Sequence, residues 1–452
     1  MVGIKGVGMT MLAQFLVSKG CLVSGSDTEE VFMTDQTLKK SHIKVFSGFK
    51  ESNIPTNTDL VIYSTAYNMG NNIELVKVKN MGIEIVSYAE VLGSVFNDYQ
   101  GLAVIGSHGK TTVSAWLGYV MFKVGLNPNV LVGSRVKQFG GSCLIGESEY
   151  LVAEVDEYQN KLQYFKPKMI VLNNIDYDHH DFFKKESDYI SAFSNFVKKL
   201  PASGFLVANF DDARVVKVSK VSKGKTISYG IYNEQARYIA RSIETTSYGQ
   251  RFSLDGLGFF KIKLLGEHNV LNALAVIVTC LELGVKVDEI RKYLLSFCGT
   301  ERRLQILGSF NNALVIDDYA HHPSEIKATL CGLRSMYKNR RIIIVFHPHT
   351  YTRTLSLLKD FAQSFRETNQ LIVLDIYGSA REKQGGVHSL DLVREIGEYN
   401  NMEGVRQGVK YIPTLVACEK YLSRYLKPND VLILMGAGDV FKIGQGLVKK
   451  KK

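Results

Sequence analysis

Short apolar runs recur along the chain, and most are followed by polar or glycine-rich residues and then by a segment with helical spacing. Residues 270–283 show the helical spacing clearly, with Leu271, Leu274, Val278 and Leu281 three or four positions apart. The apolar runs predict buried strands at residues 21–23, 59–63, 84–86, 101–105, 150–153, 169–172, 313–316, 342–346, 371–374 and 431–434. Strands that alternate with helices are typical of an α/β fold with largely parallel sheets.

The positions of the glycine-rich and polar stretches divide the chain into three segments. We expect domains at residues 1–97, 98–298 and 299–452. A chain of 452 residues is long enough for about three domains. The composition, 45% hydrophobic and 22% charged, is that of an ordinary globular protein. No stretch approaches the ~18 uninterrupted apolar residues of a membrane span, so we expect no membrane insertion.

The cysteines and the N-terminal stretch predict a cytoplasmic location. The six cysteines include no Cys-x-x-Cys pair, which predicts reduced, buried thiols. Residues 9–17 are apolar and follow Lys5, but Lys19 is unsuited to a signal-peptide cleavage site.

The net charge of +11 is diffuse, and four of those charges belong to residues 449–452 at the end of the chain. Such a charge suits either nucleic acid or small polyanionic substrates. Because basic and aromatic residues are not interleaved along the chain, we expect no nucleic-acid partner and a solvated tail.

A glycine loop with a lysine lies between the predicted strand 101–105 and a helix-like segment at 113–124. Such a loop cradles a nucleoside triphosphate, because its N–H groups and lysine face the phosphates and a threonine hydroxyl reaches Mg²⁺. Val104 stands where the common phosphate-loop pattern has its first glycine, and a turn that binds nothing is the alternative. The loop consists of Gly106, Ser107, His108, Gly109, Lys110, Thr111 and Thr112.

The N-terminal segment follows the order of a Rossmann unit: a glycine turn, a helix, a strand and an acid at Asp27. Lys5 replaces the second glycine of the usual fingerprint, and the turn comes so early that the first strand is nearly absent. We therefore expect an in-frame start upstream of Met1.

Polar clusters follow the predicted strands of the other two segments. In the central segment, residues 154–157 and 173–181 supply carboxylates and imidazoles beside the phosphate loop, where Mg²⁺ ligands are expected; polar loop caps are the alternative. In the C-terminal segment, the strand ends at residues 317–323, 347–353, 375–381 and 436–439 predict a ligand crevice at one sheet edge. Five histidines lie at or near these edges: His321, His322, His347, His349 and His388. Asn269, before the helix at 270–283, fits a helix N-cap.

Taken together, these motifs resemble the Mur ligases of bacterial peptidoglycan synthesis over nearly the whole chain. The most specific pieces are Gly-Ser-His-Gly-Lys-Thr-Thr at residues 106–112 and Asp-Asp-Tyr-Ala-His-His-Pro at residues 317–323. The resemblance implies a Rossmann-like domain that binds a UDP-linked substrate, a central phosphate-loop ATPase domain and a Rossmann-like C-terminal domain that binds the amino acid.

The resemblance also implies a reaction. ATP phosphorylates the lactyl carboxylate of UDP-N-acetylmuramate, and the amine of L-alanine displaces phosphate from the acyl phosphate to leave an amide. A recycling ligase that attaches the tripeptide L-alanyl-γ-D-glutamyl-diaminopimelate to the same sugar nucleotide is the nearest alternative. A nicotinamide-dependent dehydrogenase and a non-catalytic nucleotide-binding protein are the rivals from other classes. The expected state is a monomer or weak homodimer.

The resemblance assigns a role to individual residues. Lys110, Glu154 and His179 would be catalytic, with Thr111, Glu154 and His179 as Mg²⁺ ligands. The residues implied to contact ATP from the far side of the cleft are Asn269, Arg303, Asp318 and His322. Those implied to bind the UDP substrate are Gly6, Gly8, Ser26, Asp27, Ser64 and Thr65, and those for alanine are Tyr319, His321, His349 and Arg353. Three departures from the family pattern are Lys5, the pair Tyr158-Gln159, and Thr350 in place of a frequent arginine.

Overall fold

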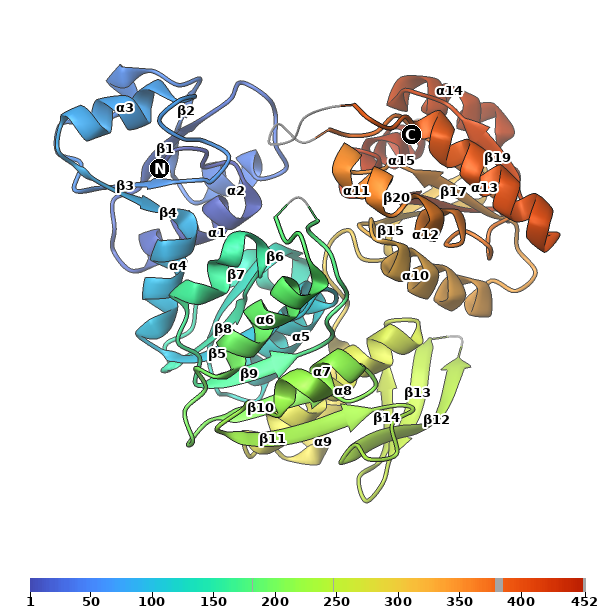
Figure 1. The fold of residues 1–452 in the computed structure, drawn as a ribbon, viewed down its shortest axis with the longest axis horizontal. Coiled ribbons are helices and arrows are strands. Elements are labelled where there is room, and N and C mark those ends of the chain that lie inside the picture. Colours follow the sequence, from blue (N-terminus) through green and yellow to red (C-terminus); the bar gives the residue numbers. More distant parts are fainter. Residues whose placement is uncertain (181, 247, 379–384, 450–452) are drawn as a thin grey trace.

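The protein consists of three α/β units, seen in the computed structural model as separate masses around a central sheet (Figure 1). The structure describes residues 1–180, 182–246, 248–378 and 385–449. Asp181, the segment 379–381 and the last three lysines, which belong to polar clusters or to the tail considered above, lie outside the described residues.

The N-terminal unit is a small parallel sheet with helices on both sides. Val2 forms single bridges to Ser26 and to Tyr63, and so joins two strand pairs into one layer. The first strand is thus reduced to one paired residue, as the sequence indicated. The elements are α1 (Val7–Ser18), β1 (Ser24–Asp27), α2 (Asp35–Lys40), β2 (Lys44–Ser47), β3 (Leu60–Tyr63), α3 (Ile73–Asn80), β4 (Glu84–Ser87) and α4 (Tyr88–Asn97).

One strand prediction in this unit is wrong. Residues 21–23 are not a strand: β1 comprises Ser24–Asp27 instead, and Leu22 is fully exposed. Ser26 N donates to Met1 O, so pairing with the start of the chain sets the strand position. The apolar character of residues 21–23 therefore does not mark a buried strand.

The central unit is built on a mixed sheet in the order β14-β13-β12-β11-β10-β9-β5-β8-β6-β7. Helices α5, α8 and α9 pack on one face and helices α6 and α7 on the other, with an apolar cluster on each side. The elements are β5 (Gln100–Ile105), α5 (Lys110–Lys123), β6 (Asn129–Val136), β7 (Gly141–Leu144), β8 (Tyr150–Glu154), β9 (Met169–Leu172), α6 (Glu186–Val197), β10 (Phe205–Asn209), α7 (Ala213–Ser219), β11 (Lys225–Gly230), β12 (Tyr238–Thr246), β13 (Gly249–Leu254), β14 (Gly258–Ile262), α8 (Glu267–Glu282) and α9 (Val287–Ser296).

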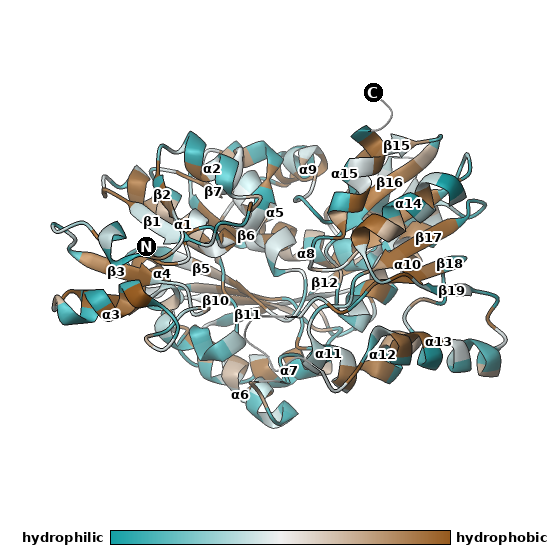
Figure 2. Ribbon diagram, turned by 90° about the horizontal axis from the view of Figure 1, so that it is seen from above, coloured by the Kyte–Doolittle hydropathy of each residue, from teal (hydrophilic) through white to brown (hydrophobic). Residues whose placement is uncertain are grey.

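The C-terminal unit has a sheet in the order β15-β16-β20-β17-β18-β19, in which β15 pairs antiparallel with β16 and the other neighbours pair parallel. The strands β17 and β18 are largely hydrophobic in Figure 2, and an apolar cluster lies on each face of the sheet, beneath the helices. The elements are β15 (Gln305–Phe310), β16 (Ala313–Asp318), α10 (Pro323–Met336), β17 (Ile342–Phe346), α11 (Tyr351–Ser356), α12 (Leu358–Ala362), β18 (Gln370–Val373), α13 (Ser389–Glu403), β19 (Gly408–Tyr411), α14 (Leu415–Tyr425), β20 (Val431–Met435) and α15 (Phe441–Lys449).

The six cysteines are free thiols, but they are not all buried as expected: Cys21, Cys298 and Cys331 are exposed. No helix in the described parts of the chain combines the length and apolar character needed to span a bilayer. The parallel strands β16, β20, β17 and β18 bring their carboxyl ends to one edge, which faces the central unit.

Candidate active site between three domains

The glycine loop between β5 and α5 has the backbone shape that a phosphate requires. Gly106 and Gly109 have φ angles of 133° and 79°, which residues other than glycine rarely adopt. A Cβ at Gly109 would lie 2.5 Å from Asn272 Oδ1, so glycine is also required there for space. Lys110 begins α5, and its Nζ donates to Gly106 O at 2.5 Å and Ser107 O at 3.2 Å. The loop therefore folds around its own lysine at a helix N-terminus.

Acidic side chains surround that lysine. Lys110 Nζ contacts Glu157 Oε2 at 3.1 Å, and Glu157 is 1% exposed. Burial lowers the pKa of Lys110, but the charges of Glu157, Asp156 and Glu154 outweigh this effect and raise it. The side chain of Lys110 is therefore a charged ammonium. It can bind a phosphate that takes the place of its carboxylate partner, Glu157.

The predicted metal ligands fall into two neighbouring groups. Thr111 Oγ1 donates to Glu154 Oε1 at 2.7 Å, and Gly133 N donates to Glu154 Oε2 at 2.7 Å. His179, which has a left-handed φ of 57°, instead faces Glu157, with Nε2 3.6 Å from Oε1. The group of Asp156, Glu157 and His179 could itself hold a metal ion. A hydroxyl and a carboxylate are ligands that Mg²⁺ prefers, so Thr111 and Glu154 fit that ion.

Two cavities meet at the phosphate loop. The larger, about 810 Å³, lies between the central and C-terminal units and is lined by His108, Gly109 and Thr112. The smaller, about 260 Å³, lies beside α1 and α4 of the N-terminal unit and is lined by Lys110 and Glu154. Different residues of the loop thus line the two cavities: His108, Gly109 and Thr112 line the larger one, and Lys110 lines the smaller one.

Most residues expected to contact ATP from across the cleft line the larger cavity: Asn269, Arg303 and Asp318 do so. Asn269 is not the N-cap of its helix, because α8 begins at Glu267 after Gly266. The Asn269 side chain instead donates to Leu265 O and accepts from Asn272, which holds its amide at the cavity wall.

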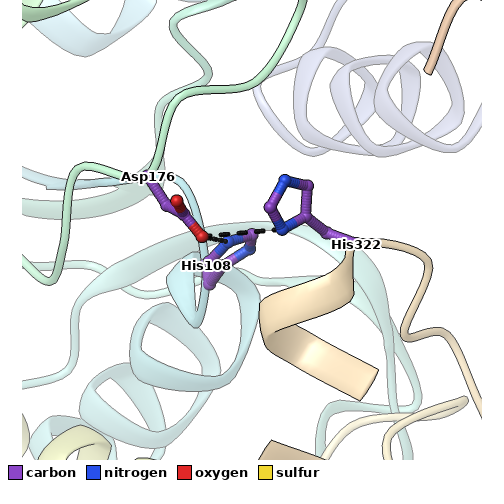
Figure 3. A group of neighbouring side chains, drawn as sticks. All are labelled: His108, Asp176 and His322. Atoms are coloured by element: carbon purple, nitrogen blue, oxygen red, sulfur yellow. Dashed lines mark hydrogen bonds and ion pairs between the residues drawn. The ribbon is translucent and has the colours of Figure 1, made fainter. Parts of the chain in front are cut away.

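His108 and His322 meet across the domain boundary, around Asp176 (Figure 3). His108 Nε2 lies 3.1 Å and His322 Nδ1 3.5 Å from Asp176 Oδ2. The other nitrogen of His108 faces Glu325 Oε1 of α10 at 3.4 Å. Burial lowers the pKa of His108, but hydrogen bonds to Asp176 and Glu325 overcome this and raise it to about 9. A charged His108 therefore ties the phosphate loop to the C-terminal unit.

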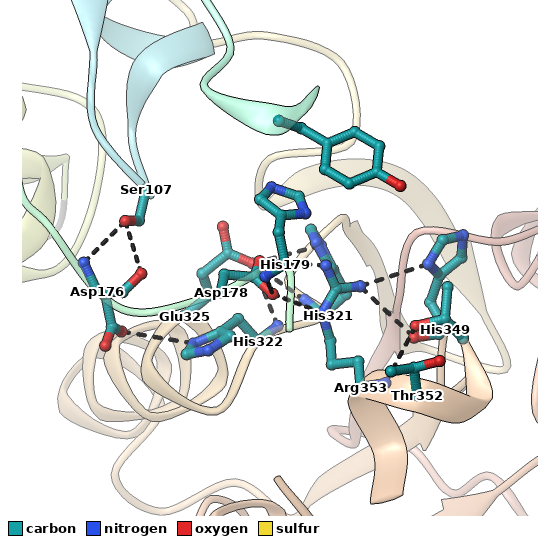
Figure 4. A network of polar contacts seen from close by, with 12 residues as sticks. Ser107, Asp176, Asp178, His179, His321, His322, Glu325, His349, Thr352 and Arg353 are labelled. Carbon is teal, nitrogen blue, oxygen red and sulfur yellow. Dashed lines mark hydrogen bonds and ion pairs between the residues drawn. The ribbon is translucent and has the colours of Figure 1, made fainter. Parts of the chain in front are cut away.

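The residues expected to recognise alanine gather at the carboxyl edge of the C-terminal sheet (Figure 4). The rings of Tyr319 and His321 meet edge to face, and the ring of His321 lies 6.2 Å from that of His349. Burial lowers the pKa of His321 to about 3, so its imidazole is neutral. Arg353 pairs with Asp178, a residue of the central unit.

In the N-terminal unit, the predicted UDP-binding residues lie around the glycine turn, where Asp27 accepts from Lys5 N at 2.7 Å and from Thr28 N at 2.8 Å. Lys5 has no left-handed backbone, and its Nζ turns away to the carbonyls of Thr28 and Glu30. Replacement of a glycine by Lys5 is thus accommodated in the turn. Of the other predicted residues, Gly6 and Gly8 lie at the start of α1, Ser26 donates to Glu74, and Ser64 and Thr65 follow β3.

Four acidic residues of the site had no individual role in the sequence prediction: Glu157, Asp176, Asp178 and Glu325. The first three lie in the polar clusters after β8 and β9, so the sequence located them without assigning partners. Glu325 occupies the third position of α10 and forms a capping box with His322. His388, grouped with the edge histidines, similarly caps α13 and is more than half exposed.

Comparison with known proteins gives one consistent result. Residues 1–100 match the model described as "Mur ligase family, catalytic domain", residues 104–280 "Mur ligase middle domain", and residues 302–438 "Mur ligase, glutamate ligase domain". The UDP-N-acetylmuramate--L-alanine ligase of Desulfitobacterium hafniense (strain Y51) is 36% identical over 99% of this chain and 98% of its own length. The protein of that name from Acetivibrio thermocellus is 39% identical over 100% and 95%.

Solved structures show the same arrangement. UDP-N-acetylmuramate-alanine ligase MurC from Thermotoga maritima superposes with a TM-score of 0.82 at 25% identity, covering 100% of this chain and 98% of its own. A murein peptide ligase from Psychrobacter arcticus superposes with a TM-score of 0.75 at 22% identity, covering 99% and 97%, which shows a shared fold.

Proposed function

The chain belongs to the Mur ligase family, and from that membership we propose that it joins L-alanine to the lactyl carboxylate of UDP-N-acetylmuramate in an ATP-dependent reaction. Full-length relatives that carry this activity in their names support the substrates. The observation that carries the proposal is the position of the phosphate loop between two cavities. One cavity suits a nucleotide, and the other suits an acid delivered from the N-terminal unit.

The proposed reaction has two steps. A carboxylate oxygen of UDP-N-acetylmuramate attacks the γ-phosphorus of ATP, so that the bond to ADP breaks and an acyl phosphate forms. The amine of L-alanine then attacks the acyl carbon, phosphate leaves, and the amine proton passes to solvent. Catalysis of this kind depends on positioning and charge neutralisation, and the charge of Lys110, which lines the smaller cavity next to the glycine loop, supports that role.

We assign ATP to the larger cavity, with Gly106, Ser107, His108, Gly109, Thr111 and Thr112 around its phosphates. Asn269, Arg303, Asp318 and His322 hold it from the C-terminal side. We propose Mg²⁺ at Thr111 and Glu154, whose oxygens suit it, with His179 and Glu157 as donors for a second ion. Bound there, Mg²⁺ supplies neutralisation of phosphate charge.

The remaining assignments follow the family pattern. UDP-N-acetylmuramate contacts Gly6, Gly8 and the ends of β1 and β3, and alanine contacts Tyr319, His321, His349 and Arg353. We further propose that the protein works in the cytoplasm as a monomer or weak homodimer, which gel filtration with light scattering tests.

The test of function is a phosphate-release assay with purified protein, in which ATP, Mg²⁺, UDP-N-acetylmuramate and L-alanine are omitted one at a time. We expect turnover to require all four. Turnover with L-alanyl-γ-D-glutamyl-diaminopimelate and none with alanine would replace the proposal by the tripeptide ligase. A shared fold with the murein peptide ligase makes that arm of the assay necessary.

A further inference from the structure

An ion pair joins the central and C-terminal units at the proposed amino-acid site. Arg353 Nε donates to Asp178 Oδ1 at 3.2 Å, and Nη2 donates to Asp178 Oδ2 at 3.1 Å. Both side chains are 10% exposed. The two residues come from the loop after β9 and from α11, and lie 175 positions apart in the chain. A two-point carboxylate–guanidinium pair of this kind is both strong and directional.

The pair raises a chemical question about the amino-acid site. Arg353 is the cation assigned to the carboxylate of alanine, yet one edge of its guanidinium already holds a carboxylate. Among the described residues, the other edge, at Nη1, makes contacts of 3.5 Å to His349 Nδ1 and His349 O. A second carboxylate can therefore approach Nη1 while Asp178 keeps Nε and Nη2.

Alanine is a zwitterion, and a buried ammonium needs an anion as much as a buried carboxylate needs a cation. The neighbouring His321 cannot supply that anion, because a histidine ring is neutral or cationic, and the Nδ1 of His321 faces Tyr319 O at 3.0 Å. The carboxylate of Asp178 lies against Arg353, so one anion and one cation stand side by side. Together they match the two charges of an α-amino acid.

We propose that Asp178 binds the ammonium group of alanine and, with Arg353, forms a two-charge clamp that selects α-amino acids as the acceptor. This inference rests on the proposed ligase function and adds a specificity-determining residue to it. The clamp requires both units, so the amino-acid site is complete only when the C-terminal unit contacts the central one.

The position of Asp178 also places the amine beside the reacting phosphate. Asp178 Oδ1 accepts from the N–H of His179 at 2.7 Å, and His179 Nε2 faces Glu157, the partner of Lys110. A chain of contacts thus leads from Arg353 through Asp178, the His179 backbone and ring, and Glu157 to Lys110; Figure 4 shows its first part, from Arg353 to His179. An ammonium held at Asp178 has to lose one proton to solvent before its lone pair can attack the acyl carbon.

The test compares acceptors on the variant Asp178→Asn. Asparagine keeps an Oδ1 that accepts from His179 N but removes the charge. We expect kcat/KM for L-alanine to fall about 10- to 100-fold, through a raised KM for alanine. L-Alaninamide, which has the ammonium but lacks the carboxylate, should lose the same factor. Hydroxylamine, which is largely uncharged at neutral pH, attacks the acyl phosphate to give a hydroxamate and phosphate, and its rate should stay within about twofold.

Two control variants assign the two ends of the clamp. Arg353→Gln should lower kcat/KM for L-alanine but leave L-alaninamide nearly unchanged, since the amide offers no carboxylate. The matched control is Asp188→Asn, which removes an exposed carboxylate at the start of α6. Its kcat/KM for each acceptor should equal that of the unmodified protein.

The outcomes separate the inference from the function. An equal loss with hydroxylamine and alanine would show that Asp178 acts through domain contact alone and would overturn the inference. A loss with alanine but none with alaninamide would place Asp178 at the carboxylate end, which also overturns it. If the unmodified protein forms no hydroxamate from UDP-N-acetylmuramate and ATP, the proposed function itself fails.

Discussion

Lys110 is the residue on which the chemistry depends most directly. Its ammonium has loop carbonyls and Glu157 as partners, and the three nearby carboxylates keep it charged. Those partners position the side chain at the mouth of the smaller cavity before a phosphate arrives. Because the ammonium is already held beside the loop, it needs little movement to exchange Glu157 for a phosphate.

We expect Lys110→Ala to lower kcat by about 10³-fold or more, because a group that stabilises transferring phosphate charge is lost. Binding of UDP-N-acetylmuramate should change by no more than about twofold, since the proposed contacts with the nucleotide end lie in the N-terminal unit. Calorimetric titration and an ADP-release assay measure the two quantities. Lys123→Ala, at the exposed end of the same helix, is the matched control. Loss of sugar-nucleotide binding in a folded Lys110→Ala protein would contradict the domain assignment.

Helix α5 connects this loop to the core. It is buried along most of its length, and Trp116 stacks on Phe297 with ring centroids 5.3 Å apart. Gly118 lies against β6, and a Cβ there would be 2.5 Å from Val130 Cγ2. Close packing of the helix onto the sheet therefore depends on the absence of a side chain at Gly118.

We expect Gly118→Ala to destabilise the protein by about 1–3 kcal/mol, since the added methyl group has to displace Val130. Gly397→Ala makes the same change within α13, where a Cβ would meet nothing within 4 Å. That control should be neutral or stabilising by about 0.5–1 kcal/mol. Urea unfolding followed by circular dichroism compares the two, and the fluorescence of Trp116, the single tryptophan, assigns the Gly118 transition to the central unit. Equal effects would refute the packing argument.

Elements that a buried apolar run defines were predictable from the sequence. Residues 169–172 and 342–346 were expected as strands and are β9 and β17 with those bounds, because both are completely buried. The strand prediction at residues 21–23 was wrong because this apolar run is not buried against another surface; Leu22, for example, is exposed. The strand β1 is instead held by hydrogen bonds to the start of the chain. Local periodicity reports burial of a segment, not the pairing that a distant segment provides.

The same distinction separates the parts of the site. The phosphate loop is local in sequence, so its glycines, lysine and threonine could be read directly. The pairing of His179 with Glu157, and of Arg353 with Asp178, depends on how loops from different strands meet. Single-sequence reasoning gives the residue types at each sheet edge, but partner choice follows only from the packed domains.

For the whole molecule, charged and polar side chains form several of the contacts between the central and C-terminal units. His108 bridges Asp176 and Glu325, and Ser324 of α10 donates to Asp176. Arg135 and Glu301 add a more exposed pair at the connection between the units. Charged contacts of this kind respond to pH, unlike the apolar cores within each unit.

The expected pH response follows from the raised pKa of His108. A group whose pKa is raised by contact stabilises that contact fully below its ordinary value of 6.5, and the stabilisation is lost as pH rises through about 9. The whole shift corresponds to about 3.5 kcal/mol at about 1.4 kcal/mol per pKa unit, and only the part that Glu325 causes acts between the units, because Asp176 belongs to the central unit. The ligand-free protein should therefore be compact near pH 6.5 and more open above about pH 9.

Small-angle X-ray scattering at constant ionic strength measures this opening as an increase in the radius of gyration. His108→Gln, which keeps a polar amide but cannot carry a charge, should remove the change across this pH range. Circular dichroism at each pH shows whether the units stay folded, so that separation of domains is distinguished from unfolding. An equal pH response in His108→Gln would show that other groups control the contact. A response confined to the unmodified protein would place the control of domain closure in the phosphate loop itself, since His108 lies between its two glycines.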